Sequence, residues 1–219
     1  MLSYTEENYL KAIYHLSADG KNAVSTNAIS DCLNTKPASV SDMLKKLSGK
    51  EVIHYVKYQG VTLTVKGKKL ALQIIRKHRL WEVFLVEKLK FNWDEVHEIA
   101  EQLEHIQSNL LIERLDEYLG YPVYDPHGDP IPNERGEIKA KRQVPLSELE
   151  LHTSGLVIGL KETSPPFLQY LDKTGIYINA KVKVMDKIEF DGSLEILIDN
   201  KKTILVSNEV SKNIFVTQT

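Results

Sequence analysis

The sequence predicts an α+β protein with an N-terminal winged helix-turn-helix, a helical dimerisation domain and a small C-terminal β-barrel. Residues 1–70 hold three helical patterns and then two short β runs, which is the order of a winged helix-turn-helix. Residues 71–140 hold long helical patterns, whereas residues 141–219 hold short strand patterns separated by turn signals. These observations set the expected domain limits at 1–70, 71–140 and 141–219.

The first two helices are predicted from caps and periodicity. Ser3 and Glu6 form the sequence pattern of a capping box, and the apolar residues after them recur with the helical period. A short second helix follows Ser25, which is a preferred N-cap residue. The tight connection after it ends at Thr35 or Lys36, either of which can cap a third helix.

The third helix and the wing complete the N-terminal domain. Pro37 suits the first turn of a helix, where its missing N–H costs nothing. The buried face of this helix is expected to consist of Val40, Met43, Leu44 and Leu47. Two β runs follow, Ile53–Tyr58 and Val61–Val65, and a turn at Gln59-Gly60 joins them.

Basic residues are concentrated in one stretch of an otherwise acidic chain. Residues 36–79 hold eleven Lys or Arg against Asp42 and Glu51, a local charge of +9, which leaves −11 for the rest of a chain whose total is −2. Such segregation suits a module that binds phosphates, although a charge run is more often a solvated face.

The third helix of such a module enters the major groove of DNA. The residues expected to face the groove are Thr35, Pro37, Ala38, Ser39, Ser41 and Asp42. The residues expected to contact phosphates are Lys36, Lys45, Lys46, Lys57 and Lys66. The alternative is that this domain only mediates contacts with proteins.

Composition narrows the class of protein further. No apolar run approaches the roughly 18 residues of a membrane span, and the N-terminal residues lack the features of a signal peptide. We therefore expect a soluble cytoplasmic protein with no membrane partner. Cys32 is the single cysteine, so a disulfide within one chain and a thiolate cluster are both excluded, and a metal site would need imidazole and oxygen ligands.

The middle domain is expected to consist of two long helices. The first covers Gly67 to Lys90, and the second begins at a capping box of Asn92 and Glu95 and runs to about Leu119. The apolar stripe of the second helix is wide enough for more than one neighbour, so we expect it to form a homodimer. A two-fold symmetric dimer would place two recognition helices on a near-palindromic operator.

These helices carry the residues suited to metal binding. Glu101, Glu104 and His105 are spaced i, i+3 and i+4, and His97 lies one turn before Glu101. On the preceding helix His78 and Glu82 form another i, i+4 pair, which could complete one site or form a second. The alternative is that these side chains are solvated or paired in salt bridges.

The C-terminal part follows a segment rich in Pro, Gly and charge, from about Pro122 to Pro145, which is typical of a linker. Asp191-Gly192 and Asn200-Lys201 are hairpin signals. The expected strands are Leu156–Leu160, Ala180–Phe190, Leu194–Asp199 and Thr203–Val206, with a short helix near Pro166–Leu171.

Together these segments resemble the diphtheria-toxin-repressor-like metalloregulators, which include iron-responsive and manganese-responsive members. The resemblance covers nearly the whole chain. Its landmarks are Glu7-Asn8-Tyr9-Leu10 with Ile13-Tyr14, Lys36-Pro37-Ala38-Ser39-Val40-Ser41, Leu63-Thr64-Val65-Lys66-Gly67, Arg76-Lys77-His78-Arg79-Leu80, Val96-His97-Glu98 and Leu103-Glu104-His105.

The resemblance implies a primary regulatory site that bridges the first two domains, with Asn8, Glu101, Glu104 and His105 as ligands. Iron-type members have methionine and cysteine at the positions of Asn8 and Glu101, and manganese-type members have carboxylates at both. This chain follows the manganese type at Glu101 and neither type at Asn8. A set of oxygens and imidazole favours Mn²⁺, with Fe²⁺ as the alternative.

The resemblance also implies an ancillary site formed by His78, Glu82 and His97, with His127 as a further ligand. Asp125 stands where related manganese-type regulators have the cysteine of a metal-binding Cys-Pro-His. His78 could instead belong to a binuclear cluster with Glu101 and Glu104. The C-terminal part is similar to the SH3-like domain of longer family members, in which a residue near Glu162 reaches the ancillary metal.

The resulting hypothesis is a metal-responsive repressor that binds double-stranded operator DNA as a homodimer and controls genes of metal homeostasis. Two other classes stay open. A regulator of an organic ligand would use the same DNA-binding domain. A metal-dependent hydrolase would use the same ligands, but the sequence offers no nucleophile motif or phosphate-binding glycine loop, so no enzymatic activity is expected.

Overall fold

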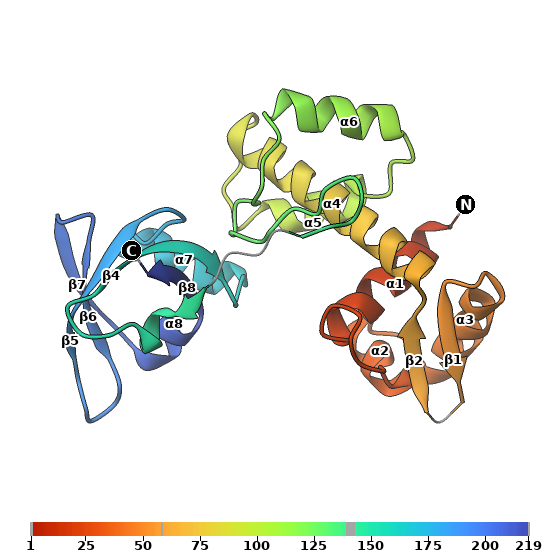
Figure 1. Cartoon of the computed structure of the whole chain (residues 1–219), viewed down its shortest axis with the longest axis horizontal. Coiled ribbons are helices and arrows are strands. Elements are labelled where there is room, and N and C mark those ends of the chain that lie inside the picture. The colour runs from red at the N-terminus through yellow and green to blue at the C-terminus, as the bar shows by residue number, and fades with distance from the viewer. Residues whose placement is uncertain (1, 58, 139–142, 219) are drawn as a thin grey trace. The chain divides into compact units, whose positions relative to one another are not determined.

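The N-terminal helices form where caps and apolar periodicity coincide. The computed structural model describes residues 2–57, 59–138 and 143–218 (Figure 1). Helix α1 (Tyr4–Leu16) begins with the predicted capping box, in which the Ser3 N–H donates to Glu6 Oε2 at 2.7 Å. Helices α2 (Thr26–Cys32) and α3 (Pro37–Gly49) follow, with Ser25 and Lys36 as their N-caps. The three predicted helices are confirmed.

The wing is a two-stranded antiparallel hairpin of β1 (Ile53–Val56) and β2 (Gly60–Leu63), grouped with α1, α2 and α3 in Figure 1. Val24 adds a third, single-residue bridge to Val61. Gly60 has a φ of +101°, and a Cβ there would lie 2.7 Å from the Val24 carbonyl oxygen, so this turn needs glycine. The predicted end of the first strand, Tyr58, lies outside the described residues.

The helical period of α2 predicts that Cys32 is buried, but Cys32 is exposed. Otherwise the core of this domain contains the apolar residues that the helical periodicity predicts. Those with no exposed surface are Leu10, Ile13, Ile29, Val40, Leu44 and Leu47. Met43 packs against the same cluster while only partly buried. The basic helix α3 therefore has one face fixed in the core, which leaves its other face for a partner.

The middle of the chain corrects one prediction. Helix α4 (Val65–Glu87) is the expected long helix, but the single helix expected from Asn92 to Leu119 is wrong, because it is divided into α5 (Val96–Leu103) and α6 (Asn109–Tyr118). Residues 93–95 form a turn. Only one half of the predicted capping box is present among the described contacts: the Asn92 N–H donates to Glu95 Oε2 at 3.1 Å. Among the described helices, none combines the length and apolar character that a membrane span requires.

The break between α5 and α6 has a physical cause in tertiary contacts. Glu104 and His105 leave the helix and contact side chains from α1 and α4, and these charged contacts replace the helical hydrogen bonds that would continue α5. Ser108 then starts α6, since its hydroxyl accepts the Leu111 N–H at 3.3 Å. The break thus frees two side chains for a site away from the helix axis.

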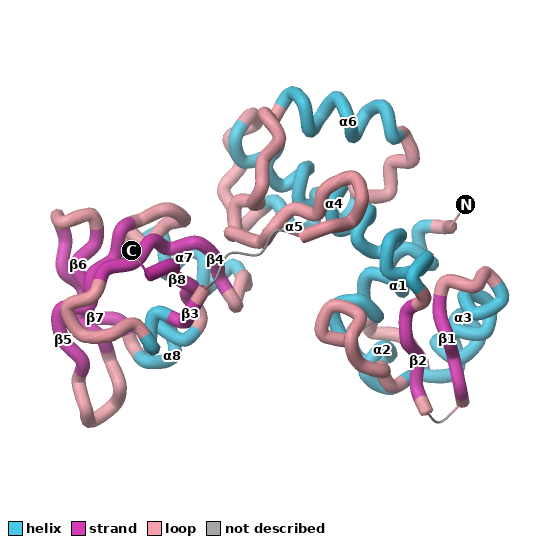
Figure 2. The backbone as a smooth tube through the Cα atoms, in the orientation of Figure 1, coloured by secondary structure: helices cyan, strands magenta, loops and turns pink. Residues whose placement is uncertain are grey.

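The C-terminal part is a six-stranded antiparallel sheet. Helices α7 (Pro165–Thr174) and α8 (Asn208–Lys212) lie beside its strands (Figure 2). The strands are β3 (Val144–Pro145), β4 (Ser154–Leu160), β5 (Lys181–Lys187), β6 (Leu194–Ile198), β7 (Lys202–Val206) and β8 (Ile214–Gln218), in the order β3-β8-β4-β5-β6-β7. The four predicted strands and α7 are present. The sequence did not predict β3, β8 or α8.

Turns and bulges shape this sheet. The β6–β7 hairpin turns at Asp199 and Asn200, which have φ values of 50° and 57°, one residue earlier than predicted. Irregular registers occur between Val157 and Gly159 and between Val184 and Asp186, and such bulges bend a strand. One apolar core joins the strands with Leu168 and Leu171 of α7.

The described chain forms two compact units. The first holds Met1–His78, Glu101–Ile112 and Pro132–Ile138, and the second holds Arg79–Ala100, Glu113–Ile131 and Lys139–Thr219. The domain limits at residues 70 and 140 stay predictions. Each unit contains its own cluster of candidate metal ligands among the described residues.

Candidate metal centres and DNA-binding surface

The first turns of α3 present small, mostly uncharged side chains at the surface. Lys36, Pro37, Ala38, Ser39 and Asp42 are exposed, and Thr35 and Ser41 are half-buried. Asp42 is paired with Lys45 at 3.0 Å, which partly neutralises the one acidic group of this surface. The surface therefore has the size and polarity to approach DNA bases without a strong repulsive charge.

All five lysines expected to contact phosphates are exposed, and some also have partners in the protein. Lys46 Nζ lies 3.2 Å from Glu6 Oε1, and Lys66 Nζ donates to the Lys50 carbonyl at 3.0 Å. Burial raises the pKa of Glu6, but hydrogen bonds from Lys50, Ser3 and Lys46 outweigh it and lower the pKa to about 2. Lys46 thus also helps to hold α3 against α1.

The first unit contains cluster A, which we define as Glu7, Lys11, His78, Glu101, Glu104 and His105. Helix α1 supplies two members, α4 supplies His78, and α5 with the turn after it supplies the other three. Glu7 and Lys11 are one turn apart on α1, so they project from the same face of that helix. The cluster therefore links the DNA-binding module to the end of α5.

Glu104 lies at the centre of cluster A and has no exposed side-chain surface. Its two oxygens accept hydrogen bonds from Lys11 Nζ at 2.6 and 2.8 Å, and Oε2 lies 2.6 Å from His78 Nδ1. Burial raises the pKa of Glu104, but the hydrogen bond with His78 and the charge of Lys11 outweigh it and leave the pKa below its ordinary value. Glu104 is therefore an ionised carboxylate in a buried place.

His105 is oriented by a carboxylate. Its Nδ1 lies 2.6 Å from Glu7 Oε2, and Gln107 donates to the other oxygen of Glu7 at 2.8 Å. The ring of Tyr4 lies 3.8 Å from the His105 ring, centroid to centroid. A histidine held through one nitrogen by a carboxylate presents its other nitrogen as a basic ligand.

Two buried atoms, one on His105 and one on Asn8 of α1, indicate whether a metal ion fits this cluster. Neither His105 Nε2 nor Asn8 Oδ1 has a hydrogen-bond partner among the described residues, although His105 Nε2 lies 3.5 Å from Glu104 Oε1. Buried polar atoms are normally paired, so an unpaired imidazole nitrogen and an unpaired amide oxygen call for an explanation. A divalent cation is a suitable partner for both atoms, and the residues present fit the ion that the sequence predicted.

Cluster A includes two residues, Glu7 and Lys11, for which the sequence predicts no role at the metal site. The i, i+4 spacing of Glu7 and Lys11 around Asn8 was a usable signal, because it places all three near one face of the first helix. Sequence alone gave no reason to pair that face with residues about 90 positions later.

The second unit contains cluster B, which we define as Glu82, Asp125 and His127. All three are buried, and one potential ligand atom from each lies within 4.8 Å of the others. His127 Nε2 donates to the Trp93 carbonyl at 2.8 Å, which leaves Nδ1 toward Glu82 Oε1 at 3.8 Å. This tautomer presents an imidazole nitrogen beside two carboxylates, so the group fits a divalent cation.

Cluster B is built on a tight loop. Asp125 Oδ1 accepts the N–H groups of His127 and Asp129, each at 2.9 Å, and its Oδ2 lies 3.5 Å from Arg79 Nε. Gly128 has a φ of +87°, and a Cβ there would lie 2.2 Å from the Ile158 carbonyl oxygen, so only glycine allows the loop to approach β4. The loop thus holds Asp125 and His127 in fixed positions.

Burial and mutual charge shift the titration of cluster B. Burial raises the pKa of Asp125 to about 7, with help from the charges of Glu82 and Asp129. Burial lowers the pKa of His127, but the hydrogen bond and charge of Glu82 outweigh it and raise the pKa to about 9. Without a metal ion the cluster therefore holds protons at neutral pH that a metal ion would replace.

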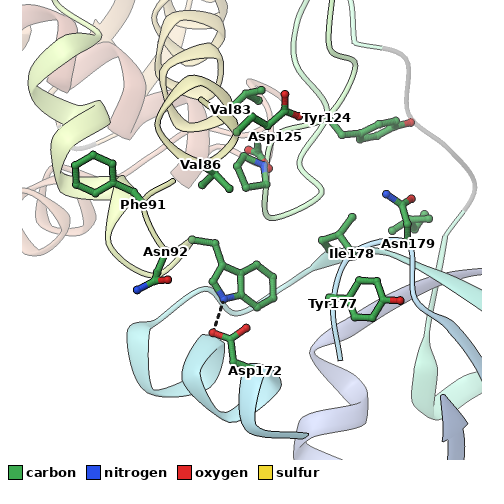
Figure 3. Close-up of a pocket in the computed structure, with 14 residues that line it drawn as sticks. Val83, Val86, Phe91, Asn92, Tyr124, Asp125, Asp172, Tyr177, Ile178 and Asn179 are labelled. Atoms are coloured by element: carbon green, nitrogen blue, oxygen red, sulfur yellow. Dashed lines mark hydrogen bonds between the residues drawn. The ribbon is translucent and has the colours of Figure 1, made fainter. Parts of the chain in front are cut away.

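A cavity of about 490 Å³ borders cluster B at Asp125 (Figure 3). Trp93, Tyr124, Tyr177 and Asn179 also line it, and Trp93 Nε1 donates to Asp172 Oδ2 at 3.1 Å. Of the three members of cluster B, only Asp125 lines this cavity.

The other predicted ligands, His78, His97 and Glu162, lie in three different surroundings. His78 contacts Glu104 and lies 3.9 Å from Glu101 Oε1, so it belongs to cluster A. His97 Nδ1 lies 3.6 Å from Glu82 Oε1, but the His97 side chain is 66% exposed. Glu162 is exposed and accepts the Ser164 N–H at 2.8 Å, and it is not part of the cluster B group. The metal-binding roles of His97 and Glu162 stay predictions.

Three family models match consecutive parts of the chain. The DNA-binding domain of iron-dependent repressors matches residues 1–61, their metal-binding and dimerisation domain matches residues 64–133, and the FeoA domain matches residues 144–218.

Individual relatives are transcriptional regulators of the same kind. The chain is 34% identical over 115 residues to the HTH-type transcriptional regulator MntR of Oceanobacillus iheyensis, covering 52% of this chain and 77% of that protein. It is 28% identical over 220 residues to the iron-dependent repressor IdeR of Mycobacterium leprae, covering 94% of each. Among solved structures, a manganese-dependent transcriptional repressor in complex with manganese is 32% identical, with a TM-score of 0.84 over 98% of this chain and all of that one.

Proposed function

Because the chain belongs to the iron-dependent repressor family, we propose that it represses transcription by binding operator DNA as a homodimer when Mn²⁺ occupies cluster A. The observation that carries this proposal is the pairing of Glu7 on α1 with His105 after α5, at 2.6 Å. It connects a helix of the DNA-binding module to the metal-binding part of the chain.

The proposed ligands are Asn8, Glu101, Glu104 and His105, with His78 beside them. A bound divalent ion supplies positive charge and directional bonds to oxygen and imidazole nitrogen, which favour bringing these side chains together. Glu7 holds the His105 ring in position, and His78 holds one oxygen of Glu104. Two buried atoms that form no hydrogen bond within the described residues, Asn8 Oδ1 and His105 Nε2, support this assignment, and His105 Nε2 lies 3.5 Å from Glu104 Oε1, another proposed ligand.

The mechanism couples α1 to the turn after α5. Asn8 lies on α1, which packs into the same core as α2 and α3, so a constraint on α1 is transmitted to the recognition helix. In a dimer, this constraint would set the separation of the two recognition helices on DNA. Metal affinity and DNA affinity would then be coupled reciprocally, typically by about 1 to 3 kcal/mol.

The dimer is proposed to involve apolar residues that the described chain leaves at the surface of α6. Leu110 and Tyr118 are each 65% exposed, and Leu111 is 40% exposed. Exposed apolar side chains at this density on one helix are typical of an interaction surface. The match to a family model for metal binding and dimerisation supports this role.

Manganese is proposed rather than iron because of the donor atoms. The proposed ligands, Asn8 and members of cluster A, offer amide, carboxylate and imidazole groups and no thiolate or thioether, and Cys32 lies elsewhere, on α2. Hard donors of this kind suit Mn²⁺, whereas Fe²⁺ binds similar sets of ligands with higher intrinsic affinity. Which ion occupies the site in the cell therefore also depends on the concentration of each free ion. The solved relative that contains manganese supports the choice.

Cluster B is proposed as an ancillary site for a second ion of the same kind, with Glu82, Asp125 and His127 as ligands. Its support is the close approach of three buried ligand-type side chains on a fixed loop. His97, beside Glu82 at the surface, is a candidate fourth ligand.

The test is fluorescence anisotropy with a labelled promoter fragment that contains the operator, at fixed salt. Protein treated with chelator is compared with protein given Mn²⁺, Fe²⁺ under anaerobic conditions, or Zn²⁺. We expect the protein to bind the labelled DNA tightly only when a metal is present. With each ion at its physiological concentration, we expect the tightest DNA binding with Mn²⁺. Equal binding with and without metal would contradict the proposal.

A second candidate function, a regulator of an organic ligand, has one observation in its favour, the cavity of about 490 Å³ in Figure 3. Its volume and aromatic lining suit a small molecule. If chelator left operator binding unchanged while a metabolite extract altered it, this second function would replace the first.

A further inference from the structure

Lys11 is the unusual member of cluster A, since its ammonium lies where a metal-binding cluster would be expected to hold only ligands. Nζ lies 2.6 Å from Glu101 Oε1 and 2.6 and 2.8 Å from the two oxygens of Glu104. An ammonium has three N–H donors, and these three oxygens match them. The Lys11 side chain is only 13% exposed, so this arrangement is largely shielded from water.

We propose that the Lys11 ammonium is a resident cation of cluster A, which takes the place of a second metal ion and limits the cluster to one divalent ion. The inference rests on the proposed function, because it concerns the same centre. It decides against the binuclear arrangement of His78, Glu101 and Glu104 that the sequence left open.

Charge supports this inference. The Lys11 ammonium contacts two carboxylates, Glu101 and Glu104, and the third carboxylate of the cluster, Glu7, contacts His105. Three carboxylates and one ammonium leave a net charge of about −2, which a single divalent cation neutralises. A second divalent ion would therefore enter a cluster whose negative charge is already balanced, at a distance where repulsion is strong.

The geometry shows why the position of Lys11 is effective. Lys11 follows Glu7 by one turn of α1, so Glu7 reaches His105 while Lys11 reaches Glu101 and Glu104. The same helix thus contributes a residue that orients a ligand and a cation that pairs with two carboxylates. A carboxylate at position 11 would add a ligand at the place where the ammonium now neutralises charge.

The test uses the full-length protein and counts Mn²⁺. Wild type, Lys11→Glu and a control, Lys21→Glu, are dialysed against Mn²⁺, and the bound metal per chain is measured by elemental analysis. Lys21 is exposed, so its variant reproduces the change in net charge away from cluster A. Comparison with wild type cancels any ion held by cluster B.

We expect Lys11→Glu to bind one more Mn²⁺ per chain than wild type and the control, with the EPR spectrum of an exchange-coupled pair that wild type lacks. A coupled pair in wild type, or no additional ion in a folded Lys11→Glu, would overturn the inference. Wild type that bound no Mn²⁺ in cluster A would overturn the proposed function itself.

A second variant, Lys11→Met, tests the ammonium without adding a ligand. It keeps the length of the side chain and removes its charge, so we expect the protein still to bind one Mn²⁺ in cluster A, roughly tenfold more tightly than wild type. Affinity equal to or weaker than that of wild type would overturn the role of Lys11 as a competing cation. Circular dichroism melting confirms that each variant is folded.

Discussion

Replacement of Glu104 by glutamine removes one charge from the centre of cluster A while keeping the shape of the side chain. In wild type this buried carboxylate accepts two bonds from Lys11 and lies 2.6 Å from His78 Nδ1. Breaking a buried charge pair typically costs about 3 to 5 kcal/mol. Lys11 keeps its contact with Glu101 at 2.6 Å and so is not left unpaired, which reduces the expected cost to about 2 to 3 kcal/mol, below that range.

The effect is measured first on the metal-free protein. We expect the thermal midpoint of Glu104→Gln, in the presence of chelator, to fall by roughly 4 to 12 °C, since about 1 kcal/mol corresponds to about 2 to 4 °C for a chain of this size. Glu98→Gln is the matched control, because Glu98 is exposed on α5 and the change of charge is identical. This control should melt within about 2 °C of wild type.

The effect is measured next on DNA binding. In wild type, Mn²⁺ is expected to increase operator affinity by about 5-fold to 150-fold, the usual range of allosteric coupling. The Glu104→Gln variant should lose that increase, and Glu98→Gln should keep it. If Glu104→Gln retained the full response to Mn²⁺, or melted at the wild-type temperature, the central role assigned to Glu104 would be refuted.

Four further outcomes are expected. Lys36→Ala should lower the slope of log affinity against log salt by about 1 in anisotropy titrations, since one phosphate contact is lost, and an unchanged slope would count against that contact. Asp125→Cys should shift the preference of cluster B from Mn²⁺ toward Zn²⁺ in a competition with a zinc dye, because a thiolate is a softer ligand. The pKa of His127 is raised to about 9 and that of Asp125 to about 7, so both groups bind more protons in the folded state than in the unfolded state. Their contribution to the free energy of unfolding therefore falls as pH rises. Without metal, the contribution of Asp125 to the free energy of unfolding is present below about pH 4 and is lost as pH rises through about 7. The contribution of His127 is present below about pH 6.5 and is lost as pH rises through about 9. His127→Gln should therefore flatten the curve of unfolding free energy against pH above about pH 6.5, measured by urea unfolding. Leu110→Asp should convert the dimer to a monomer in light scattering, and an unchanged mass would exclude this part of α6 from the interface.

Local sequence patterns determined much of the N-terminal domain. The capping box of Ser3 and Glu6, the N-cap Ser25 and the glycine of the wing act between residues close in the chain, so each can be recognised without a three-dimensional structure. The same is true of the apolar faces of the helices, because the helical period places them together. The ligand types at positions 101, 104 and 105 were likewise visible from their spacing.

Long-range contacts decided the rest. The end of α5 at Leu103 depends on contacts that Glu104 and His105 make with α1 and α4, and these energies outweigh the helical periodicity that had predicted a single helix. In the C-terminal sheet, β8 lies between β3 and β4, a pairing between strands far apart in sequence. Neither arrangement has a local signal.

Cluster A shows the division most clearly. The sequence by itself determined which residue types could hold a divalent ion, because imidazole and carboxylate groups recur at helical spacing. Only the tertiary structure decided that Glu7 orients His105 and that the Lys11 ammonium occupies Glu101 and Glu104. The physical reason is that charge pairing depends on distance in space, and the two groups of residues are about 90 positions apart in the chain.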